Sequence, residues 1–173
     1  MNENLKKTVF GALLAAIVCV ATLVVQWPSP VNGYVNLGDA FVLLSGWLLG
    51  PLYGTAAAGI GSMLTDLISA YPHYAPGTLV IKALVALAAA LVYKALGKKN
   101  YALPISAVLG EIIMVLGYFG YAALLLGKGI TAALSIPGNL IQAAVGVAAG
   151  TALMLVMKKF KIDRMFTDGG HNS

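Results

Sequence analysis

Charged residues are scarce in this 173-residue chain, at 10%, whereas hydrophobic residues make up 60%. A soluble domain carries about 25% charged residues, so this chain has too few to cover a water-soluble globule of its length. The same composition excludes disordered, collagen-like and coiled-coil chains. A lipid bilayer is therefore the expected environment, and the length corresponds to a single domain over residues 1–173.

Residues that commonly carry out catalysis are also missing. The one cysteine, Cys19, excludes an intramolecular disulfide, and the two histidines do not fall at metal-ligand spacing. No phosphate-binding Walker loop is present, and Ser62 lacks the flanking glycines of a nucleophile elbow. We therefore expect no catalytic residue, no metal site and no cofactor bound by this chain. Active transport would have to draw its energy from ions or from a partner.

Long apolar runs account for most of the chain. A membrane-spanning helix needs about 20 residues, so the run from 37 to 70 is too long for one crossing, and the turn at Gly50-Pro51 divides it. The first run has no signal-peptide cleavage site and is expected to remain as a span. The sequence thus predicts an all-α integral membrane bundle of six transmembrane helices, at about 9–25, 37–49, 52–70, 78–96, 102–126 and 136–157.

The basic residues indicate how the bundle is oriented. Nine of the eleven lysines and arginines fall on the side of the N-terminus, which makes both termini and the basic tail, residues 158–173, cytoplasmic. The net charge of +5 could indicate a nucleic-acid partner, but the basic residues lie at the ends of apolar segments. We expect a multi-pass protein of a bacterial-type plasma membrane that binds no nucleic acid.

Four ionisable residues fall within the predicted spans: Asp39, Asp66, Lys82 and Glu111. Each costs about 2.5–3.5 kcal/mol to insert, so each suggests a functional or a structural role. Asp39 begins a helix and is suited to cap it, whereas Asp66 opposes the dipole at the end of its own helix. We therefore predict a structural ion pair between Asp66 and Lys82, and contact of Lys82 with a ligand is the open alternative.

Other polar residues gather toward the outer ends of the predicted helices. Aromatic and apolar walls with a few convergent polar groups are typical of small-molecule sites. Some members have other interpretations, because the loop tyrosines could anchor at the membrane interface and the amides could join helices. His73 is interpreted as an ordinary loop residue. The predicted substrate-binding residues are Asn36, Tyr71, Tyr74, Lys82, Glu111, Tyr118, Asn139 and Gln142.

Small residues form a stripe on the first predicted helix, at Gly11, Ala12, Ala15 and Ala16. Small residues four apart allow another helix to approach closely. The stripe predicts a docking surface for a partner, and packing within the bundle is the alternative.

Several motifs in order along the chain give it a resemblance to a known family. They are Ala12-x-x-x-Ala16, Gly33-Tyr-Val-Asn-Leu-Gly-Asp39, Leu49-Gly-Pro-Leu-Tyr-Gly54, Ala57-Ala-Gly-Ile-Gly-Ser-Met-Leu-Thr-Asp66 and Tyr74-Ala-Pro-Gly-Thr-Leu-Val-Ile-Lys82. The chain resembles the S components, the substrate-binding membrane subunits of energy-coupling-factor (ECF) vitamin transporters. The resemblance covers nearly the whole chain.

The resemblance implies a function and a set of partners. S components bind one vitamin or precursor from outside and dock on a transmembrane coupling subunit, which carries two ATPase subunits that use ATP. Ala12 and Ala16 match the docking motif. Within the family the chain is most similar to the hydroxymethylpyrimidine and vitamin B6 branch, with riboflavin or thiamine as alternatives. A self-sufficient proton-coupled transporter using Glu111, or a small intramembrane enzyme, is the alternative outside the family.

Overall fold

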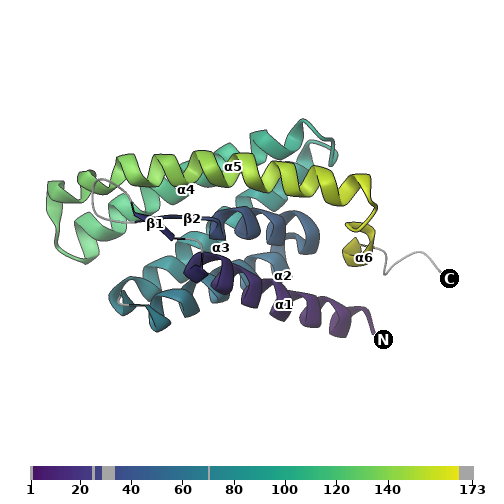
Figure 1. Ribbon diagram of the computed structural model, residues 1–173, viewed down its shortest axis with the longest axis horizontal. Coiled ribbons are helices and arrows are strands. Elements are labelled where there is room, and N and C mark those ends of the chain that lie inside the picture. The colour runs from purple at the N-terminus through teal and green to yellow at the C-terminus, as the bar shows by residue number, and fades with distance from the viewer. Residues whose placement is uncertain (1, 25, 29–33, 70, 168–173) are drawn as a thin grey trace.

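The computed structural model describes residues 2–24, 26–28, 34–69 and 71–167 of the chain. The predicted helix ends at 25 and 70 and the last six residues of the tail lie outside these ranges. Within them, five helical stretches are long and apolar enough to cross a membrane. The α-helices are α1 (Glu3–Val24), α2 (Gly38–Ile68), α3 (Ala75–Ala95), α4 (Ala102–Gly120), α5 (Ile136–Lys159) and α6 (Arg164–Thr167), arranged as a bundle (Figure 1).

Helix α2 consists of two helical segments that fold back on each other at Gly50. Gly50 has φ 75° and ψ −170°, a conformation that a residue with a side chain adopts only with strain, and Pro51 follows it. A Cβ added at Gly54 would lie 2.2 Å from the Ser45 carbonyl oxygen, although nine residues of straight helix would separate them by roughly 13 Å. The predicted break is confirmed, and α2 supplies the second and third predicted helices.

Short elements that the sequence analysis did not predict join the helices. Strands β1 (Gln26–Pro28) and β2 (Tyr34–Asn36) form an antiparallel pair with Trp27 opposite Val35, between the first and second predicted helices. Residues 71–77, between the third and fourth predicted helices, contain the 3₁₀-helix η1 (Pro72–Tyr74) and the first turn of α3. A π-helical turn, η2 (Tyr121–Leu125), extends α4, and the 3₁₀-helix η3 (Gly129–Ser135) precedes α5.

Small residues bring the helices close together in the core. A Cβ at Gly61 would lie 2.4 Å from the Ala15 carbonyl oxygen, and one at Gly46 would lie 2.4 Å from the Ala86 carbonyl oxygen. In a bilayer there is no hydrophobic force between helices, so such backbone approaches supply the van der Waals contact that holds a bundle together. The pairs fix α2 against α1 and against α3.

The two ends of the bundle differ in chemistry. At the end where α1 begins, the rings of Phe10 and Phe166 lie 4.5 Å apart, which places α6 beside the start of the chain (Figure 1). At the other end, the start of α2, the start of α3 and the end of α1 come together around polar residues. That this polar end faces outward, with cytoplasmic termini, stays a prediction.

Candidate functional site

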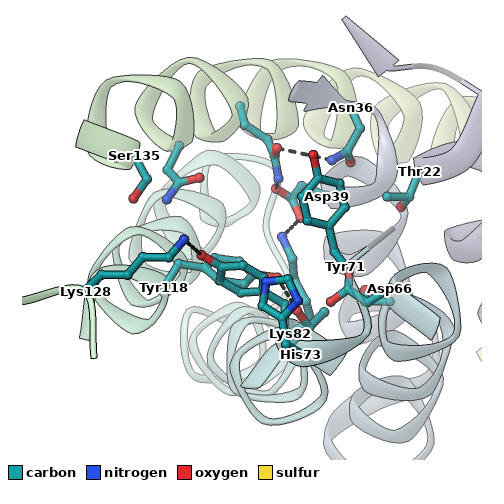
Figure 2. A pocket seen from close by; sticks show the side chains of 15 residues that line it. Thr22, Asn36, Asp39, Asp66, Tyr71, His73, Lys82, Tyr118, Lys128 and Ser135 are labelled. Atoms are coloured by element: carbon teal, nitrogen blue, oxygen red, sulfur yellow. Dashed lines mark hydrogen bonds and ion pairs between the residues drawn. The ribbon is translucent and has the colours of Figure 1, made fainter. Parts of the chain in front are cut away.

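A cavity of about 420 Å³ lies at the polar end of the bundle (Figure 2). Side chains from α1 to α5, from β2 and from the short helices between them surround it. They are Thr22, Asn36, Asp39, Ser62, Asp66, Tyr71, His73, Tyr74, Thr78, Lys82, Tyr118, Lys128, Ser135, Asn139 and Gln142. The volume falls within the range of about 300–1,000 Å³ that is typical of small-molecule sites.

Seven of the eight residues predicted to bind substrate line this one cavity. Their separation in the sequence is large, since Asn36 and Gln142 are 106 residues apart and yet hydrogen bonded. The seven are Asn36, Tyr71, Tyr74, Lys82, Tyr118, Asn139 and Gln142. The structure thus brings them together, and substrate binding by them stays a prediction.

A chain of polar contacts crosses the floor of the cavity. Lys82 on α3 forms an ion pair with Asp39 on α2, and both side chains are buried. Gln142 on α5 donates to the second oxygen of Asp39 at 2.7 Å, and Asn36 donates to Gln142 at 3.1 Å. The Lys82 ammonium also lies 5.5 Å from the centre of the Tyr118 ring, within cation–π range. The network fixes the orientation of side chains from β2 and three helices.

The predicted ion pair between Asp66 and Lys82 is wrong, because Lys82 pairs with Asp39. The prediction assumed that the Asp39 carboxylate caps α2, but the N-cap residue is Leu37 and makes no side-chain cap. The side chain of Asn36 instead accepts a hydrogen bond from the Gly38 backbone N–H at 2.8 Å. Asp39 is therefore free to turn to Lys82, while Asp66 lines the cavity with one buried oxygen that has no hydrogen-bond partner.

Glu111 is the predicted substrate-binding residue that the structure places away from the cavity lining. Only 2% of its surface is exposed, and neither carboxylate oxygen has a hydrogen-bond partner. It lies seven residues before Tyr118 on α4, which is roughly 10 Å deeper along the helix axis. A Cβ at Gly146 would lie 3.1 Å from one Glu111 oxygen and 2.9 Å from the Asp39 Cβ, so Glu111 lies behind Asp39.

Aromatic rings form one side of the cavity. The ring of Tyr74 lies 6.4 Å from that of Tyr118 and 4.8 Å from that of His73. The Tyr118 hydroxyl is 3.0 Å from the Thr78 hydroxyl, and Lys128 donates to the Tyr74 hydroxyl at 2.9 Å. Such rings can stack on a flat ligand ring while their hydroxyls stay hydrogen bonded.

Several lining residues were missed or given another role in the sequence analysis. His73 was interpreted as a loop residue and Asp66 as an ion-pair partner, yet both line the cavity. Lys128 also lines the cavity and was not predicted to do so. The available signal was the flanking Gly127 and Gly129, whose positive φ values of 66° and 54° let the chain turn sharply at Lys128. The hydroxyl-bearing lining residues, Thr22, Ser62, Thr78 and Ser135, carried no sequence signal.

The small-residue stripe on α1 divides into two faces. Gly11 and Ala15 are buried against α2, so their assignment to a docking surface is wrong and the packing alternative holds for them. Ala12 and Ala16 are exposed on the helix surface. Neighbouring residues point about 100° apart around a helix, which separates the two pairs. Ala12 and Ala16 therefore remain available to a partner.

The side chains around the cavity are suited to binding a small molecule. Among the described residues, no group of three or more histidine, cysteine, aspartate or glutamate side chains could hold a metal ion. The lining offers carboxylate, ammonium, amide and hydroxyl groups beside aromatic rings. This combination can hold a flat, polar ring by stacking and by hydrogen bonds at its edge.

Comparisons with known proteins agree with this architecture. A chain described as the S component of a bacterial ECF transporter superposes with a TM-score of 0.71 and 24% identity, over 91% of this chain and 98% of that one. A Pyrococcus woesei protein, described as an uncharacterized protein in the gap 3′ region, is 40% identical over 144 residues, which are 82% of this chain and 95% of that protein. The family model for ECF-type riboflavin transporter S components matches residues 2–159. The chain therefore belongs to the family of ECF-type riboflavin transporter S components.

Proposed function

We propose that this chain captures riboflavin at the outer face of the plasma membrane and delivers it to an ECF-type importer. The observation that carries this proposal is the 420 Å³ cavity, in which aromatic rings face a buried hydrogen-bonding network. A fused three-ring flavin with a hydroxylated side chain would use both the aromatic side and the polar floor. The matching family model also supports riboflavin over the smaller vitamins.

A second candidate is a single-ring vitamin of the pyridoxine or hydroxymethylpyrimidine type. It is favoured by Asp66, whose buried carboxylate oxygen has no hydrogen-bond partner and borders the cavity. A protonated ring nitrogen, or the amino group shared by hydroxymethylpyrimidine and thiamine, would donate to that oxygen. Riboflavin has no cationic donor, so it would reach this carboxylate only through neutral N–H and O–H groups.

Uptake in this proposal depends on partner subunits. Ala12 and Ala16, exposed on α1, would contact a transmembrane coupling subunit, which in turn carries two ATPase subunits that use ATP. This chain itself would bind no cofactor, and its termini would be cytoplasmic. Proton-driven transport by this chain alone, with Glu111 as a proton relay, is the alternative outside the family. Glu111 is buried behind the cavity lining, with both carboxylate oxygens lacking a hydrogen-bond partner.

Mass spectrometry of small molecules released from the purified chain tests the substrate directly. Riboflavin is the expected molecule, and isothermal titration of ligand-free protein should rank it above pyridoxine, hydroxymethylpyrimidine and thiamine. A higher affinity for any single-ring vitamin would replace riboflavin by the second candidate. Uptake by this chain alone into ATP-free vesicles, driven by a proton gradient, would contradict the dependence on partners.

A further inference from the structure

A second hollow, of about 540 Å³, lies on the outside of the bundle. Residues 76–81, around the first turns of α3, form one side, and residues 117–125, at the end of α4 and in η2, form the other. We call this hollow the α3–α4 groove. Both sides belong to helical stretches that are apolar enough to span a membrane.

A glycine without a backbone role opens the groove. Gly120 has φ −63° and ψ −44°, which is ordinary helix, so its backbone does not need a glycine. A Cβ built there would meet nothing within 4 Å. The missing side chain therefore leaves space in the groove. The π-helical turn begins at the next residue, and such turns are frequent at functional sites.

The groove is almost entirely apolar. Among its described lining residues, the tyrosine hydroxyl of Tyr121 is the polar side-chain group, and it donates to the His73 carbonyl oxygen at 3.0 Å. At the rim, Leu124 is 82% exposed, Leu125 75% and Val80 56%. In a membrane-spanning chain, such residues face lipid hydrocarbon. A vitamin would find no free hydrogen-bonding side chain in this groove.

We propose that the α3–α4 groove is a specific binding site for one acyl chain of a membrane lipid. The bilayer supplies hydrocarbon chains at this surface, and their chemistry matches the lining. An acyl chain in the groove would make van der Waals contacts with both helices. Without an occupant, the side chains that line the groove would lack these contacts.

The groove shares a wall with the vitamin cavity. The Tyr121 ring lines the groove, and its centre lies 6.0 Å from that of Tyr74, which lines the cavity. A Cβ at Gly77 would lie 2.7 Å from the Tyr121 ring carbons, so this ring is packed directly against the start of α3. A lipid chain in the groove would therefore support the aromatic side of the cavity from outside.

Photolabelling of the full chain in lipid vesicles tests this site. The probe is phosphatidylglycerol with a diazirine in its acyl chain, and labelled peptides are mapped by mass spectrometry. We expect labelling of residues 76–81 and 117–125 to exceed that of other exposed helix faces several-fold. Gly120→Phe should fill the groove and remove this excess. Ala148→Phe, at an exposed position of α5, is the matched control and should preserve it.

Either of two labelling results would overturn the proposal, and so would a third obtained with a coupling subunit present. One is labelling spread evenly over all exposed helix faces, and the other is groove labelling that Gly120→Phe leaves unchanged. Loss of the labelling whenever a coupling subunit is added would likewise show a protein contact surface instead of a lipid site. The melting temperature of Gly120→Phe reports whether it folds, and Val80→Trp fills the groove from α3 if it does not.

Discussion

The cavity end of the bundle and the exposed face of α1 use side chains in opposite ways. At the cavity, polar groups from β2, α2, α3 and α5 are buried and satisfy one another, as in the contacts of Asp39 with Lys82 and Gln142. On α1, the exposed Ala12 and Ala16 offer little beyond their small size. The first arrangement is suited to select a ligand, and the second to admit another helix closely.

This contrast predicts different effects for substitutions in the two regions. Substitutions at the cavity end should alter stability or vitamin affinity, whereas substitutions on the exposed face of α1 should alter uptake alone. The effect on the folded, vitamin-binding protein should be largest at the buried ion pair and smallest on the exposed face of α1.

Lys82→Met should have the largest effect. It leaves the buried Asp39 carboxylate without its cation, and breaking a buried ion pair lowers the free energy of unfolding by about 3–5 kcal/mol. Thermal unfolding in detergent measures the loss, and Lys82→Met combined with Asp39→Asn should recover much of it. Lys128→Met, at an exposed lysine, is the matched control and should melt close to the wild type. Wild-type melting of Lys82→Met would show that the pair does not stabilise the fold.

Asp66→Asn should weaken vitamin binding while leaving the fold intact. Its buried oxygen has no hydrogen-bond partner in the described structure, so a ligand donor is its expected partner. A hydrogen bond to a charged group contributes roughly 1.5–3 kcal/mol, which corresponds to about a ten- to hundredfold loss of affinity. Isothermal titration measures it. An unchanged dissociation constant would mean that the ligand does not reach Asp66.

Glu111→Gln should change affinity much less than Asp66→Asn does. The residue lies behind the cavity, so we expect a change below about threefold, or under ~0.7 kcal/mol. Because a buried carboxylate without hydrogen bonds is costly, the amide should also raise the melting temperature. A large loss of vitamin affinity in titration, with an unchanged melting temperature, would show that Glu111 belongs to the binding site.

Ala16→Trp should leave vitamin affinity and melting unchanged and yet abolish uptake in the presence of the coupling and ATPase subunits. The bulky ring would prevent close approach of a partner helix at this exposed position. Ala148→Trp, on the exposed surface of α5, is the matched control and should transport normally. Ala15→Trp, one residue away but buried against α2, should instead impair folding. Full uptake by Ala16→Trp would place the docking surface elsewhere.

The amino-acid sequence predicts structure best where a local signal decides the outcome. The break in α2 could be predicted because Gly50-Pro51 disrupts a helix whatever surrounds it. The strand pair β1–β2 was missed because three-residue strands carry too short a pattern to distinguish from a loop.

The candidate site shows the same division between local and long-range information. The depth of each polar residue along its helix follows from counting residues. Seven of the eight residues that were predicted to bind substrate do line one cavity. The depth of these residues in the bundle could not predict that Lys82 pairs with Asp39 and not with Asp66, because all three residues lie at one end of the bundle. It depended on Asn36 satisfying the first backbone N–H of α2, which freed Asp39.

The amino-acid sequence by itself determined the environment, the approximate helices, the level of the polar groups and the family resemblance, because composition and short-range periodicity carry that information. Only the tertiary structure decided the rotation of each helix about its axis. That rotation buries Gly11 and Ala15, exposes Ala12 and Ala16, and places Glu111 behind the cavity that it was expected to line. Helix rotation depends on contacts between residues far apart in the chain, such as Ala15 with Gly61, and no local pattern encodes those contacts.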